Sequence, residues 1–148
     1  MVFPGARLKG SGSTVYLYSA HGQRHAFPNE SVYRSWFTDF HDVTQISDEA
    51  LSKISLGRNV TYRPGVRLVK ITTDPKVYAI GAGRSLRWVK TEEVARTLFG
   101  PDWSQRVDDI SDAFFVNYTT GSPIEKSGDY FPERERAQIV NPSDTFQE

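Results

Sequence analysis

Aromatic side chains beside arginines are the residues of this chain best suited to bind a ligand. Tyr18 alternates with apolar residues in TVYLYS, and Trp88 follows Arg87 in LRWV. A flat ring stacks on the face of a sugar, and a guanidinium donates hydrogen bonds to sugar hydroxyls. Neighbouring residues of a strand point to opposite faces, so some of these rings belong to the core. The candidate residues for a carbohydrate or cell-wall ligand are Trp88, Tyr18, Arg24 and Arg87.

Two histidines offer a candidate zinc site. His21 and His25 flank a predicted hairpin turn, where their imidazoles could meet Asp39 or Asp42. The chain contains neither cysteine nor an HExxH motif, and neither histidine has a counterpart in the second half. Turn histidines are commonly solvated, so we predict no metal at these residues.

The segment VDDISD brings three carboxylates close together, at Asp108, Asp109 and Asp112. Hard cations such as calcium bind several oxygens within a short loop. The EF-hand pattern is absent, however, and the matching segment VTQISD lacks two of the carboxylates. Helix capping accounts for Asp48 and Asp112, which both segments share. Calcium stays open as an alternative, and we predict no cofactor.

The sequence lacks the motifs of common enzyme and nucleic-acid-binding classes. It has no cysteine nucleophile, no GxSxG elbow and no glycine-rich loop ending in GK[ST]. Lys plus Arg equals Asp plus Glu at 18 each, so no net positive charge attracts nucleic acid. No apolar run approaches the roughly 20 residues of a membrane span. We predict a protein that is not an enzyme, with no nucleic-acid partner and no membrane span.

An internal repeat organises most of the chain. Residues 27–37, FPNESVYRSWF, align without a gap to residues 89–99, VKTEEVARTLF, with four identities. Flanking segments match in the same order: PGARL with PGVRL, VY with VY, VTQISD with VDDISD, and NVTY with NYTT. We infer duplicated units at residues 4–63 and 64–121. Features of both copies are expected to serve the fold, and features of one copy are freer to serve function.

Each unit is predicted to contain one main helix. Asn29 and Thr91 are good N-cap residues at equivalent positions, and the stretches after them carry apolar residues at helical spacing. Trp36 lies on this apolar face where the second copy has leucine, so we assign it to the core. Gly100 is expected to end the second helix as a left-handed cap.

A hairpin is predicted ahead of each helix and a short capped helix after it. We predict two strand pairs with glycine in the turn: TVYLYS with RHAF, and KVYAIG with LRWV. The serine of each ISD segment reads as an N-cap, and NVTYR and FFVNYT read as closing strands. The predicted fold is therefore α+β, with two duplicated units packed around a shared core as one pseudo-twofold domain.

The remaining residues, 122–148, contain many charges and no third copy of the repeat. We interpret them as a polar linker or a loosely docked tail. The first residues, MVFPGARL, lack the basic and apolar regions of a signal peptide. Any export signal is therefore expected to lie outside this chain.

Residues 4–121 resemble a recurrent, poorly characterised repeat module of large exported or surface-anchored bacterial proteins. The resemblance lies in GSGSTVYLYSAHGQRHAFPNESVYRSWF, LGRNVTYRPGVRLVKITTDPKVYAI and LRWVKTEEVARTLFG. It implies an extracytoplasmic location and a noncatalytic role as a spacer, adhesion or assembly unit. A carbohydrate or cell-wall binding module and an accessory domain of an extracellular enzyme are the alternatives. The expected partners are a glycan or another surface protein.

Overall fold

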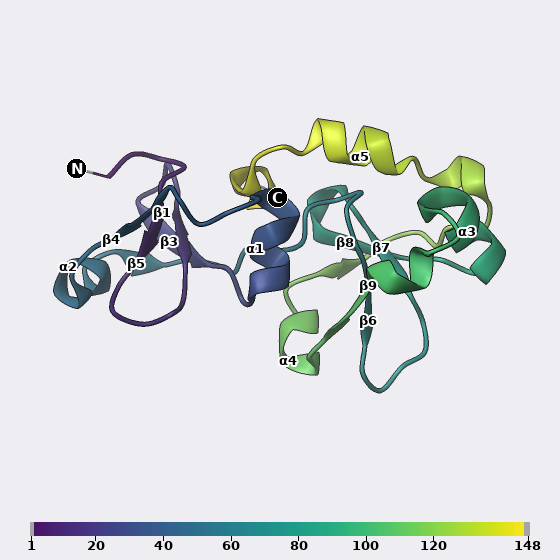
Figure 1. The fold of residues 1–148 in the computed structure, drawn as a ribbon, viewed down its shortest axis with the longest axis horizontal. Helices are drawn as coiled ribbons and strands as arrows, with labels where there is room; N and C mark the ends of the chain where they lie inside the picture. The colour runs from purple at the N-terminus through teal and green to yellow at the C-terminus, as the bar shows by residue number, and fades with distance from the viewer. Residues whose placement is uncertain (1, 147–148) are drawn as a thin grey trace.

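The computed structural model describes residues 2–146, which form an α+β fold with two five-stranded mixed sheets (Figure 1). The first sheet contains β1 (Arg7–Lys9), β2 (Tyr16–Tyr18), β3 (Gln23–Ala26), β4 (Val43–Gln45) and β5 (Ser55–Leu56). The second sheet contains β6 (Leu68–Ile71), β7 (Tyr78–Gly81), β8 (Ser85–Trp88), β9 (Val107–Ile110) and β10 (Thr119–Thr120). The helices are α1 (Glu30–Trp36), α2 (Asp48–Ser52), α3 (Glu92–Phe99), α4 (Asp112–Phe115) and α5 (Pro132–Gln138).

The two sheets have the same connectivity. In each, three consecutive strands pair antiparallel, and two later strands add in parallel at the edges. The strand orders are β4-β1-β2-β3-β5 and β9-β6-β7-β8-β10. The predicted hairpins are confirmed as β2 with β3 and β7 with β8. Their turns contain Gly22 and Gly83 at φ values of 77° and 69°, which glycine adopts without steric cost.

The main helices begin at the predicted caps. The Asn29 side chain accepts a hydrogen bond from the N–H three residues on at 2.9 Å, and Thr91 does the same at 3.2 Å. Ser47 and Ser111 cap α2 and α4, as predicted. Gly100 ends α3 with φ 94° and ψ 174°, a backbone conformation that glycine tolerates but that is not left-handed helical. Within residues 2–146, no helix has both the length and the apolar character needed to span a membrane.

The register of the sheets corrects one part of the sequence alignment. Arg7 pairs with Leu17 in the first sheet, and Leu68 pairs with Ala79 at the corresponding place in the second. The match of PGARL with PGVRL instead aligns Leu8 with Leu68. A shift of one residue moves a side chain to the other face of a sheet. Leu8 and Leu68 therefore point to opposite faces of their respective sheets.

The predicted closing strands are misplaced. Residues 59–63 contain no strand, and β5 lies earlier in the chain than expected. In the second half, α4 occupies the start of residues 114–119, and β10 begins only at the last of them. The N–H of Val60 donates to the Ala26 carbonyl at 2.8 Å, and the N–H of Ile124 donates to the Trp88 carbonyl at 2.7 Å. Val60 thus corresponds to Ile124, and the shared hydrogen-bond pattern continues beyond residue 121.

One hydrophobic cluster contains residues of both halves of the chain. The first half contributes Val15, Leu17, Phe27, Val32, Tyr33, Trp36, Val60 and Tyr62, and the second contributes Val69, Ile80, Leu86 and Ile110. Trp36 is 9% exposed, and its indole N–H donates to the Thr61 carbonyl at 2.8 Å. Its assignment to the core is therefore confirmed.

A second cluster covers the other face of the second sheet. It contains Leu68, Ala79, Val89, Val94, Ala95, Phe99, Ile124 and Tyr130. Because α3 supplies three of these residues, it lies on this face, whereas α1 lies between the two sheets (Figure 1). The layers follow the order sheet, helix, sheet, helix.

The segment after residue 121 is packed, in contrast to the loosely docked tail predicted. Ile124 and Tyr130 are 0% and 2% exposed, and the Tyr130 hydroxyl donates to the Ile80 carbonyl at 2.7 Å. Arg63 donates from Nε to the Ile139 carbonyl at 3.0 Å and from Nη2 to another carbonyl of this segment at 2.8 Å. The apolar residues that hold the segment follow neither helical nor strand spacing, so the sequence pattern did not reveal them.

Gly65 packs closely against this segment at the start of α5. Its φ is 82°, and a Cβ atom there would collide with the Pro132 carbonyl oxygen at the start of α5. Gly5, the matching glycine of the first half, has φ 91° and open space around it. We expect Gly5→Ala to cost about 1–2 kcal/mol of unfolding free energy through its backbone conformation alone. Gly65→Ala should cost at least about 1 kcal/mol more.

Chemical denaturation of the two alanine variants measures this difference. Equal losses of stability would show that the contact between Gly65 and α5 is unimportant.

Candidate functional site

The structure separates the four predicted ligand-binding residues into two pairs. Tyr18 of β2 pairs with Arg24 of β3 in the first sheet. Arg87 and Trp88 are consecutive in β8 of the second sheet, so their side chains point to opposite faces. These residues therefore do not form one site.

Both arginines are held by backbone contacts. Arg24 Nε donates to the Ile54 carbonyl at 2.9 Å, and its guanidinium lies 4.8 Å from the centre of the Tyr16 ring. Arg87 Nε donates to the Ser122 carbonyl at 2.9 Å. Through these contacts each arginine holds a chain segment next to an edge strand: Arg24 holds the residue before β5, and Arg87 holds a residue after β10.

The three aspartates of VDDISD do not converge. Asp108 accepts hydrogen bonds from Arg67 at 2.7 Å and from the Tyr62 hydroxyl at 3.0 Å. Asp109 points to the other face of β9 and accepts from Lys70 at 3.1 Å. Burial and the neighbouring Asp108 carboxylate both raise the pKa of Tyr62. Within residues 2–146, no group of three or more metal-ligating side chains comes together.

The two histidines of the first hairpin have different environments. His21 is exposed, whereas His25 is 3% exposed and stacks on Phe146 with ring centres 3.7 Å apart. Its Nδ1 lies 2.7 Å from the Arg58 carbonyl oxygen. Burial lowers the pKa of His25, so the neutral ring is favoured. His25 therefore has a packing role between the first sheet and the C-terminal segment.

Trp88 lines a hollow of about 190 Å³ where β7 begins, β8 ends and α3 starts. We call it the Trp88 hollow. It is lined by Pro75, Lys76, Val77, Trp88, Val89, Lys90, Thr91, Glu92, Ala95 and Trp103. Trp103 comes from the short 3-10 helix η2 (Trp103–Arg106) and is the second aromatic side chain of the hollow.

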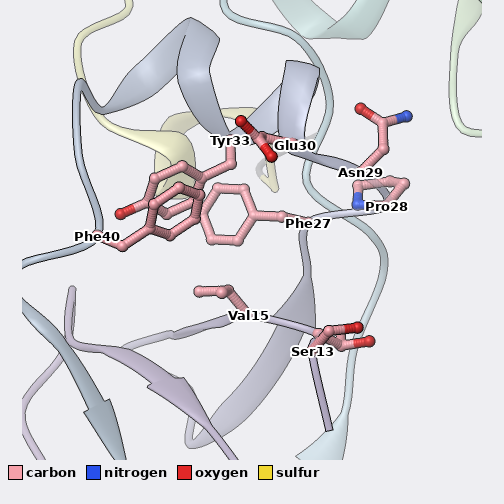
Figure 2. A pocket seen from close by; sticks show the side chains of 9 residues that line it. Ser13, Val15, Phe27, Pro28, Asn29, Glu30, Tyr33 and Phe40 are labelled. Carbon is pink, nitrogen blue, oxygen red and sulfur yellow. The ribbon is translucent and has the colours of Figure 1, made fainter.

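The first half has a corresponding hollow of about 280 Å³, which we call the Phe40 hollow (Figure 2). It is lined by Ser13, Thr14, Val15, Phe27, Pro28, Asn29, Glu30, Tyr33 and Phe40. The strand register and the helix caps make residues 13–33 of this hollow equivalent to residues 75–95 of the Trp88 hollow. Phe40 and Trp103 both come from the segment that follows the main helix. Each half thus has a hollow beside the N-cap of its main helix, with a valine, a glutamate and an aromatic ring at equivalent places.

The two hollows differ at one of their equivalent positions. In the first half, the Tyr33 and Phe40 rings lie face to face (Figure 2). Their centres are 4.3 Å apart. The position equivalent to Tyr33 holds Ala95 in the second half. Among the described residues, Trp103 has no ring stacked on it. With the smaller side chain of Ala95, Trp103 therefore lacks the stacked neighbour that Phe40 has.

Two lysines give the Trp88 hollow its electrostatic character. The ammonium groups of Lys76 and Lys90 lie 4.7 and 4.2 Å from the centre of the Trp88 ring. Both side chains belong to exposed residues, and neither forms an ion pair with a carboxylate within residues 2–146. Trp88 was predicted from the sequence, whereas the lysines and Trp103 were not. The position of these three residues next to the matching hairpin and helix could have pointed to them.

Comparison with known protein families, curated protein sequences and solved structures found no match to this chain.

Proposed function

We propose that this chain is a noncatalytic module of an exported or surface-anchored bacterial protein, where it serves as a spacer, adhesion or assembly unit. The observation that carries the proposal is the pair of equivalent hollows, one in each half. Two small sites on one chain suit attachment, because linked weak contacts add to one another in avidity. The sequence resemblance supports the extracytoplasmic location.

The same proposal includes an internal duplication. Matching strand orders, equivalent helix caps and equivalent hollows support it. In a twofold pair, equivalent faces of the two units would meet. Here α1 meets the face of the second sheet opposite to the one that α3 covers. We therefore favour a tandem arrangement of the units over the pseudo-twofold one.

Carbohydrate binding is the second candidate function, and the Trp88 hollow is the observation that favours it. Trp88 and Trp103 line one small hollow together with charged side chains. Aromatic rings provide flat apolar surface for a sugar ring, while lysine and glutamate provide donors and acceptors for its hydroxyls. The hollow is smaller than the roughly 300–1,000 Å³ pockets of drug-sized ligands, as suits one sugar ring.

Retention on insoluble wall polysaccharides and peptidoglycan tests this function. We expect the wild-type protein to be retained and Trp88→Ala to lose most of its retention, because half of the aromatic lining is removed. Phe131→Ala is the matched control, since Phe131 is an aromatic residue 45% exposed and outside both hollows. Circular dichroism checks that each variant is folded.

Two results would contradict the proposal. Equal retention of Trp88→Ala and wild type would show that the Trp88 hollow does not bind the polysaccharide. Release of soluble sugars from the polysaccharide during incubation would show that the module is catalytic.

A further inference from the structure

We propose that the Trp88 hollow binds carbohydrates that carry a carboxylate, with the sugar ring beside Trp88 and the carboxylate at Lys76 and Lys90. This inference rests on the carbohydrate-binding form of the proposed function. The shared chemistry is a pyranose ring with an acidic substituent. Uronic acid polysaccharides and the muramic acid of peptidoglycan are two sources of it.

The placement of the two lysines is the first argument. Tyr78 pairs with Trp88, and the N–H of Val89 donates to the Val77 carbonyl at 2.9 Å, so Lys76 and Lys90 lie opposite each other just beyond the paired ends of β7 and β8. Like charges at such positions destabilise a strand pair. An anion between the lysines would remove this repulsion.

Neither lysine forms an ion pair among the described residues; their ammonium groups contact the Trp88 ring. The Asp74 carboxylate accepts a hydrogen bond from the backbone N–H of Lys76 at 3.0 Å and forms no ion pair with either lysine among the described residues. Glu92 lines the hollow but forms no ion pair with Lys90 among the described residues. Among the residues that line the hollow, two lysines and one glutamate leave an excess of one positive charge.

The Phe40 hollow provides an internal comparison. Thr14 and Pro28 occupy the positions of the two lysines, so that hollow lacks the cationic pair. The whole chain has a net charge of zero, and no general attraction to polyanions is therefore expected. Preference for an acidic ligand should come from the Trp88 hollow alone.

Matched pairs of soluble sugars test the inference by isothermal titration calorimetry. The galacturonic acid trimer is compared with the galactose trimer, and the disaccharide of N-acetylglucosamine and N-acetylmuramic acid with chitobiose. We expect at least one acidic member to bind about tenfold more tightly than its neutral partner at low salt. The preference should weaken as sodium chloride is added, because salt screens exposed charges.

Charge-neutralising variants identify the residues responsible. The double variant Lys76→Gln/Lys90→Gln should lose about tenfold in affinity for the acidic sugar and little for the neutral one. The control Lys53→Gln/Lys126→Gln removes the same charge from exposed lysines outside the hollow and should bind like wild type. Whichever acidic sugar binds identifies the source of the carboxylate.

Three results would overturn the inference: no affinity for either acidic sugar, equal affinity for acidic and neutral partners, or an unchanged preference in the double variant. Failure here is distinct from failure of the proposed function. If Trp88→Ala abolishes retention on wall material while the calorimetry shows no acidic preference, only the carboxylate assignment is wrong.

Discussion

Trp36→Ala is expected to lower the free energy of unfolding by about 3–5 kcal/mol, the range for removing a large aromatic side chain from a core. Trp36 is 9% exposed and belongs to the cluster that contains residues of both sheets. The substitution leaves a cavity and also removes the hydrogen bond from the indole to the Thr61 carbonyl. Urea denaturation, followed by circular dichroism, measures the loss.

Leu98→Ala is the matched control, because Leu98 occupies the same position on α3 but is only partly buried. We expect a cost of about 1–2 kcal/mol there, since less apolar area is lost. A similar cost at both positions would contradict the placement of α1 between the two sheets, which is what buries Trp36.

Tyr130→Ala should destabilise the protein by a similar amount, about 3–5 kcal/mol. Tyr130 lies in the segment predicted to be a loose tail, yet it is 2% exposed and packs in the second hydrophobic cluster. The neighbouring Phe131 is 45% exposed, so Phe131→Ala should change stability by no more than about 0.5 kcal/mol. Equal effects of the two substitutions in urea denaturation would show that the segment is not docked.

Tyr130→Phe separates the hydrogen bond from the packing. It removes only the hydroxyl that donates to the Ile80 carbonyl, and should cost about 1 kcal/mol. Because the ring remains in place, most of the stability lost in Tyr130→Ala should be retained.

Local features of the chain were predictable because each depends on neighbouring residues. The caps at Asn29 and Thr91 and the glycines of the two hairpin turns follow from short-range backbone hydrogen bonding and sterics. The burial of Trp36 followed from its place on an apolar helical face. The closing strands were misplaced because similar residues around Asn59 and Asn117 do not determine where a strand forms. The position of each closing strand depends on its pairing with β3 or β8.

The candidate site was predictable only in part. Trp88 was identified from an aromatic residue beside an arginine in a short strand, but Arg87 points to the other face. The side chains that accompany Trp88 are Lys76, Lys90 and Trp103, which come from different elements. The pairing of β7 with β8 and the return of the chain after α3 bring these groups together.

The sequence by itself determined the repeated hairpin and helix, their caps and the apolar face of each helix, because these depend on interactions within a few residues. The tertiary structure determined which faces meet: α1 between the sheets, the segment after residue 121 against both hydrophobic clusters, and Trp103 in the same hollow as Trp88. Burial of apolar area stabilises any close-packed arrangement of faces, whatever their separation in the chain. Such contacts leave no periodic pattern for a sequence to display.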